Sequence, residues 1–93
     1  MVRWMPIAKE HLAAAHQFLS EQSPQAADEI IDLILSTVEA LSRHPRLGRQ
    51  RRVEGTRELV VAGTPFIVAY RIRRDQVHVL AVLHGAQRWP DHF

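Results

Sequence analysis

The sequence predicts an α+β fold, in which a helical hairpin packs on a twisted antiparallel sheet in the order β-α-α-β-β-β. In the first half, apolar residues recur at the spacing of a helix. In the second half, the pattern changes to short runs of β-branched and aromatic residues, which favour strands. Short connections between these runs make neighbouring strands antiparallel. The chain of 93 residues fits one domain over residues 1–93.

The N-terminal segment predicts a short strand followed by a helix. Residues 2–5, Val-Arg-Trp-Met, read as the strand. Pro6 ends it, because proline is disfavoured inside strands and suits the first turn of a helix. The helix continues over residues 7–21, whose apolar positions at helical spacing are Ile7, Ala14, Ala15, Phe18 and Leu19.

A second helix is predicted over residues 25–43. Ser23-Pro24 breaks the first helix and offers an N-cap for the second. Pro45 ends it. One broad apolar stripe runs along it, made of Ala27, Ile30, Ile31, Ile34, Val38 and Leu41. Since the break between the two helices is so short, they form an antiparallel hairpin that must bury this stripe on another layer.

Three strands are predicted in the second half, over residues 57–61, 66–72 and 77–84. The turn residues 63–65 and 73–76 separate them. Tyr70 has the same strand parity as Phe66, so its side chain is expected to face the core.

Positive charge is concentrated in the second half of the chain. Residues 43–93 carry ten arginines against four acidic residues, whereas residues 1–42 carry two basic and six acidic residues. Arginine is suited to forked contacts with phosphate or carboxylate. The densest run could therefore contact nucleic acid or an acidic protein segment, or it could be a solvated loop. It consists of Arg43, Arg46, Arg49, Arg51 and Arg52.

Several classes of site are excluded by composition and spacing. The absence of cysteine excludes disulfides, thiol nucleophiles and cysteine zinc sites. Taking His78 and His84 to lie on one face of a strand, about 20 Å apart, we expect no shared metal ion. No metal or cofactor is expected. No apolar run is long enough to cross a bilayer, and a soluble cytoplasmic protein is the expectation.

Five ordered segments carry a resemblance to a known family. Trp4 and the helical hairpin come first, followed by residues 42–49, 55–61, 65–72 and 77–90. Together they resemble the RelE/ParE superfamily of toxins from bacterial type II toxin–antitoxin modules. The resemblance implies a growth-inhibiting toxin, with a role in plasmid stabilisation. It also implies a cognate antitoxin that neutralises the toxin within a hetero-oligomer.

The resemblance leaves two targets open, because RelE-like toxins cleave messenger RNA on the ribosome whereas ParE-like toxins poison DNA gyrase. In a metal-independent ribonuclease, the arginines would clamp the phosphate while His84 served as acid or base. Those arginines are Arg57, Arg71, Arg73 and Arg88. Alternatively, His84 is a strand-end residue that hydrogen-bonds the C-terminal tail.

The resemblance implies that RelE-like ribonucleases carry a basic surface of lysines and arginines on the sheet, with a tyrosine or histidine near the C-terminus. Departures from this pattern favour the gyrase-binding hypothesis. No lysine occurs in the second half, and no tyrosine follows Tyr70. Trp89 could anchor a partner or fold back on the hairpin. The residues expected to bind partner proteins are Arg49, Arg51, Arg52, Arg57, Arg71, Arg73, Arg88 and Trp89.

Overall fold

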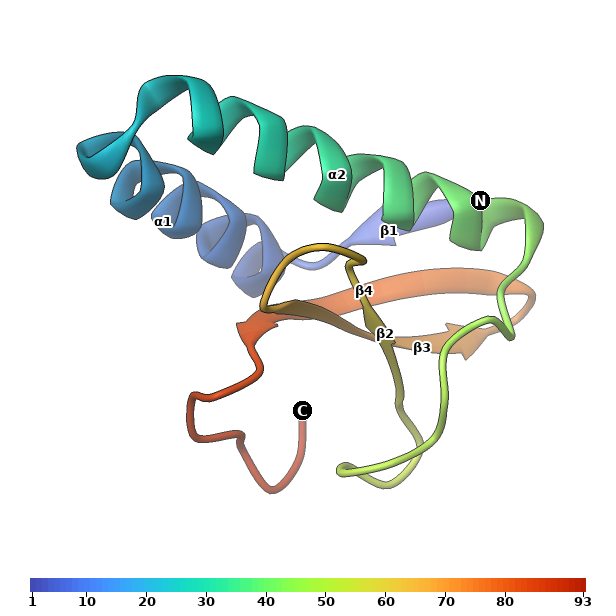
Figure 1. Ribbon diagram of the computed structural model, residues 1–93. Helices are drawn as coiled ribbons and strands as arrows, with labels where there is room; N and C mark the ends of the chain where they lie inside the picture. The colour runs from blue at the N-terminus through green and yellow to red at the C-terminus, as the bar shows by residue number, and fades with distance from the viewer.

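The computed structural model describes residues 1–93 and confirms the order β-α-α-β-β-β (Figure 1). A four-stranded sheet has the spatial order β1-β4-β3-β2. Two helices, connected by a single residue, form the predicted hairpin on one side of it. The elements are β1 (Val2–Trp4), α1 (Pro6–Gln22), α2 (Pro24–Arg43), β2 (Arg57–Val60), β3 (Phe66–Arg73) and β4 (Gln76–His84).

The sheet is mixed, which differs from the antiparallel sheet expected from the sequence. Strands β2, β3 and β4 are antiparallel neighbours, as their short connections require. Strand β1 instead lies parallel to β4, with Val2 opposite Val77. Because β1 and β4 lie at opposite ends of the chain, no tight turn fixes their direction, and only tertiary packing decides it.

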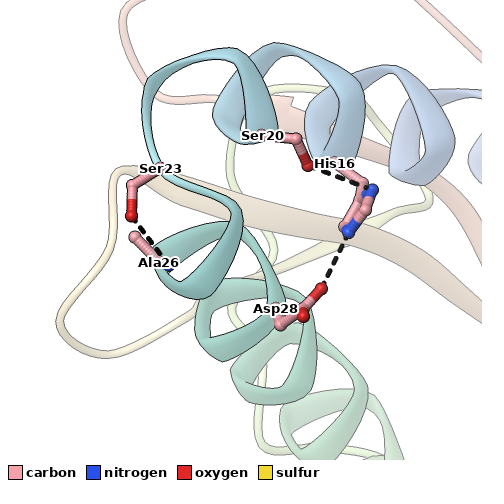
Figure 2. A network of polar contacts seen from close by, with 5 residues as sticks. All are labelled: His16, Ser20, Ser23, Ala26 and Asp28. Carbon is pink, nitrogen blue, oxygen red and sulfur yellow. Dashed lines mark hydrogen bonds and ion pairs between the residues drawn. The ribbon is translucent and has the colours of Figure 1, made fainter.

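The helical hairpin is held by a cap and by a contact between its helices (Figure 2). The Ser23 hydroxyl accepts a hydrogen bond from the backbone N–H of Ala26 at 3.2 Å, which confirms the predicted N-cap of α2. Nε2 of His16 on α1 lies 2.9 Å from a carboxylate oxygen of Asp28 on α2. This contact is exposed, so it aligns the helices more than it stabilises them.

The main core lies between the hairpin and one face of the sheet. Ile34 and Leu41 of α2 are fully buried there, together with Val68 of β3 and Val79 of β4. Tyr70 is buried among them, which confirms the face predicted for it. We call this side of the sheet the helix face.

The opposite side, which we call the tail face, is covered by the C-terminal segment (Figure 1). Trp89 and Phe93 pack there against Ala69, Ala81 and Leu83. Trp89 thus folds back on the tail face of the sheet, where Ile7 and His11 of α1 line the same hollow. Neither helix is long and apolar enough to cross a membrane.

Candidate functional site

A β-bulge in β4 changes which face each candidate residue occupies. Ala81 lies opposite Ala69 and Val79 lies opposite Tyr70, which leaves Leu80 as an extra residue between them. The alternation of side chains shifts at this point. His78 therefore lies on the tail face beside Arg71, whereas His84 lies on the helix face beside Phe66. The expectation that the two histidines share a face is wrong, because strand parity does not continue through a bulge.

The loop after α2 is fastened to the helix face by the Tyr70 hydroxyl. This hydroxyl donates a hydrogen bond of 2.6 Å to the carbonyl of Pro45 and accepts one of 2.8 Å from the N–H of Gly48. Burial raises the pKa of Tyr70 above its ordinary value, and the Gly48 N–H and the charge of Arg57 only partly oppose this. At neutral pH the hydroxyl therefore keeps its proton and can donate.

Arg57 fastens the same loop from β2. Its guanidinium donates to the carbonyl of Gly48 at 2.7 Å. A Cβ at position 48 would lie 2.7 Å from the Tyr70 ring and 2.8 Å from the carbonyl oxygen of Glu58, so the close approach requires glycine. Arg57 thus contributes to loop structure, and its guanidinium is already engaged on the helix face.

A second cluster joins the loop to the C-terminal segment on the tail face. The carboxylate of Glu58, which is 6% exposed, accepts a hydrogen bond of 3.0 Å from the N–H of Arg52. The Arg52 side chain lies 3.6 Å from the same carboxylate, and its guanidinium carbon lies 4.0 Å from the centre of the Trp89 ring. Arg52 is therefore held between a buried acid and an aromatic ring.

Arg71 lies beneath the end of the C-terminal segment. Its guanidinium is 3.4 Å from the carbonyl of Phe93. Two buried donors in this region, Nε of Arg71 and Nε1 of Trp89, have no hydrogen-bond partner within the chain. The packing of the tail on the sheet therefore leaves two hydrogen-bond donors unpaired. Unpaired buried donors are costly.

His84 occupies the end of β4 and hydrogen-bonds the tail. This was the alternative to its role as an acid or base. Its Nδ1 accepts from the N–H of Ala86 at 3.0 Å, and its own N–H donates to the side chain of Gln87 at 2.6 Å. The ring packs edge-on against Phe66, with 5.8 Å between centroids. Nδ1 is thus occupied, and the exposed ring offers Nε2 to solvent.

The structure does not bring Arg57, Arg71 or Arg73, three of the four proposed phosphate clamps, to His84. Arg73 lies at the opposite end of β3 from Phe66, the residue opposite His84. Seven residues of strand separate these ends by about 23 Å. Arg57 lies on the helix face near Tyr70, whereas Arg71 lies on the tail face.

The remaining candidates present their side chains to solvent. Arg49 pairs through its backbone with Glu58, which leaves its guanidinium exposed. Arg51, Arg73 and Arg88 are also exposed and take part in no ion pair. Exposed apolar side chains lie along the two helices, namely Ile7, Phe18, Leu33 and Leu35.

The buried polar anchors were missed at the level of sequence. Tyr70 was expected in the core, but no signal placed its hydroxyl on the loop at Pro45. No local signal in the sequence indicates that the carboxylate of Glu58 orders the loop at Arg52. The Tyr70 contacts join β3 to the loop after α2, and the Glu58 contact lies where that loop pairs with β2 at Arg49.

Comparison with known proteins now identifies the family. Residues 2–89 match the family model of the ParE toxin of the type II toxin–antitoxin system, parDE. Toxin Y4kP of Sinorhizobium fredii is 39% identical over 96% of this chain and 92% of its own length. Toxin RelE3 of Caulobacter vibrioides is 36% identical over 89% of this chain and 91% of its own length.

A solved structure has the same fold. It is described as the chromosomal ParDE TA system from P. aeruginosa and superposes with a TM-score of 0.81. The match covers 89% of this chain and 92% of that chain at 22% identity. The family match extends over nearly the whole length and includes both helices, the sheet and Trp89. The chain therefore belongs to the ParE toxin family of type II toxin–antitoxin systems.

Proposed function

We propose that this toxin inhibits growth by binding and poisoning DNA gyrase, not by cleaving RNA. The observation that carries the proposal is the separation of His84 from three of the four arginines that a ribonuclease would use. General acid–base catalysis on a phosphodiester requires a proton-transfer group within hydrogen-bond reach of the substrate, with cations around the same phosphate. Here His84 and Arg73 lie at opposite ends of the sheet, and Arg57 is engaged by Gly48.

The binding surface we propose combines the basic loop with the C-terminal segment. Arg49, Arg51 and Arg88 offer exposed, unpaired guanidinium groups. Arg52 and Trp89 form a stacked pair between them, and arginine and tryptophan are enriched where binding energy concentrates. Glu58 holds the loop in place beneath this surface, and Tyr70 anchors the same loop from the helix face.

The second partner in the proposal is the cognate antitoxin, which neutralises the toxin in a hetero-oligomer. We propose that its C-terminal segment lies across the helical hairpin and the sheet. The exposed Phe18 and Leu35 offer apolar contacts there, and the arginines would pair with its acidic groups. Binding that keeps its affinity in high salt, and after truncation of that antitoxin segment, would contradict this arrangement.

The test of the target is induced expression without the antitoxin, with DNA-damage signalling and messenger RNA ends read in the same culture. Gyrase poisoning predicts damage signalling and filamentous cells with intact transcripts. In a purified gyrase assay, Arg49→Ala/Arg51→Ala should weaken inhibition. The matched Arg43→Ala control, at an exposed position on α2 outside this surface, should not. Codon-positioned transcript cuts without damage signalling would refute the proposal.

The alternative is a ribosome-dependent ribonuclease, which the solvent-facing ring of His84 favours. His84→Gln keeps a polar side chain that can hydrogen-bond the tail but removes the titrating imidazole. If transcript cutting is found and this change abolishes it, the alternative is correct. If growth arrest persists unchanged in His84→Gln with intact transcripts, the gyrase proposal is supported.

A further inference from the structure

A basic surface with no assigned role lies where β3 turns into β4, at the end of the sheet farthest from His84. A polar hollow of about 520 Å³ is lined there by Arg3, Arg73, Arg74, Gln76 and His78, with no apolar residue among them. We name these residues the hairpin-end patch. Four of these residues belong to the hairpin of β3 and β4, whereas Arg3 is brought to them only by the pairing of β1 with β4.

Strand pairing assembles the patch on the tail face. Arg3 of β1 lies opposite His78 of β4, and His78 lies opposite Arg71 of β3. Arg73 lies opposite Gln76 one step further toward the turn. Neighbouring strands are roughly 4.8 Å apart, so basic side chains from three strands stand side by side.

The charges of the patch are not compensated within the chain. Every ion pair in the structure involves other cations, namely His16, Arg43 and Arg52. The one carboxylate in the turn, Asp75, pairs with none of the arginines. Arg3 of β1 and Arg73 of β3 lie on either side of β4, and no carboxylate of the sheet stands between them. An anion bound from outside would compensate their charge.

The turn holds Arg74 in a conformation that L-residues rarely adopt. Arg74 and Asp75 have φ values of 52° and 64°. Such turns favour asparagine and glycine at these positions, because a residue with a bulky side chain is strained there. The turn thus places a second cation beside Arg73. Asparagine or glycine would form the same turn with less backbone strain.

We propose that the hairpin-end patch binds the phosphate groups of a nucleic-acid backbone. Arginine pairs with phosphate through two parallel hydrogen bonds, and protein–nucleic acid interfaces are polar and strongly positive. An acidic protein segment fits less well, because the cores of protein interfaces are depleted of charge and enriched in aromatic residues. The lining of this hollow has neither aromatic nor aliphatic members. The site is separate from the gyrase-binding surface proposed above.

The experiment measures binding of the full-length protein to a fluorescent DNA duplex and to a single-stranded RNA of matching sequence. The test variant is Arg3→Gln/Arg73→Gln/Arg74→Gln, whose three positions are all exposed. Gln keeps the backbone preferences of Arg, and circular dichroism checks the fold. The matched control, Lys9→Gln/Arg43→Gln/Arg46→Gln, removes the same charge from exposed positions outside the patch.

The test variant should bind at least tenfold more weakly than the wild type. On the duplex, its slope of log affinity against log salt should be shallower by about 2–3, since each phosphate contact contributes about 0.9. The control should keep both values near wild type, and the probe that binds more tightly identifies the kind of backbone. Equal losses in the two triple variants would overturn the proposal. Displacement of the probe by poly-glutamate at equal charge concentration would also overturn it, in favour of an acidic peptide.

Discussion

The Tyr70 hydroxyl is the clearest single support of the loop that follows α2, and its removal gives a calculable loss. Tyr70→Phe keeps the ring in the core but leaves the Pro45 carbonyl and the buried Gly48 N–H without their partner. Each unsatisfied buried group costs about 1–3 kcal/mol. We expect the free energy of unfolding to fall by about 2–4 kcal/mol, and Tm to fall by roughly 10–20 °C.

Urea unfolding followed by circular dichroism measures this loss, and an unchanged m-value shows that the unfolded reference is comparable. Thr64→Val is the matched control. The Thr64 hydroxyl also makes two hydrogen bonds, to Val61 and from Phe66, but it is only half-buried, so water can replace it. Its loss should be about 1 kcal/mol or less. Equal losses in the two variants, or a loss below about 0.5 kcal/mol in Tyr70→Phe, would refute the reasoning.

The raised pKa of Tyr70 adds a second readout with a definite sign. An unfolded tyrosine ionises near pH 10, whereas the folded hydroxyl keeps its proton to higher pH. The hydroxyl therefore contributes its full stability below about pH 10, and that contribution is lost as the pH rises toward the folded pKa. Tyr70→Phe should lack this alkaline fall in stability. An identical alkaline profile in both proteins would show that Tyr70 does not cause it.

Three further changes test the fold around the site. Gly48→Ala should lower the free energy of unfolding in urea by at least about 1–3 kcal/mol, because the added Cβ meets the Tyr70 ring and the Glu58 backbone. The control Gly85→Ala, whose added Cβ makes ordinary contacts of 3.4 Å or more, should change little. Ser23→Ala should lower the free energy of unfolding by about 1 kcal/mol, because the N-cap of α2 is lost. Ser36→Ala, in the middle of α2, should be neutral. Equal thermal melts of the two variants would contradict this. In a Trp4→Phe background, Arg52→Ala should increase acrylamide quenching of Trp89, because Arg52 covers the ring. Arg51→Ala is the control. If quenching is no higher in Arg52→Ala than in this control, Arg52 does not shield the ring.

Much of the helical layer could be predicted because its signals are local. Pro6 and Pro24 stand at the starts of the two helices and Ser23 caps the second, so each boundary is encoded within a few residues. The apolar stripe of α2 repeats at the helical period, and its members Ile34 and Leu41 are buried as that pattern requires.

The candidate site was predicted less completely, because its geometry depends on contacts between distant residues. The family was predicted from the resemblance, and the list of candidate arginines was predicted from the sequence itself. Arg57 and Arg52 belong to that list, yet the structure engages one with Gly48 and the other with Glu58 and Trp89. No spacing rule distinguishes these two residues from the free guanidinium groups of Arg49 and Arg51.

The sequence by itself determined the order of elements, the helix boundaries, the antiparallel pairing of β2, β3 and β4, and the burial of Tyr70. Turn chemistry and hydrophobic period act over a few residues, so they can be read along the chain. Only the tertiary structure decided the parallel pairing of β1, the bulge at Leu80 and the place of the C-terminal segment on the tail face. Each of these joins residues far apart in sequence, and the packing of whole layers, not local preference, selects among the alternatives.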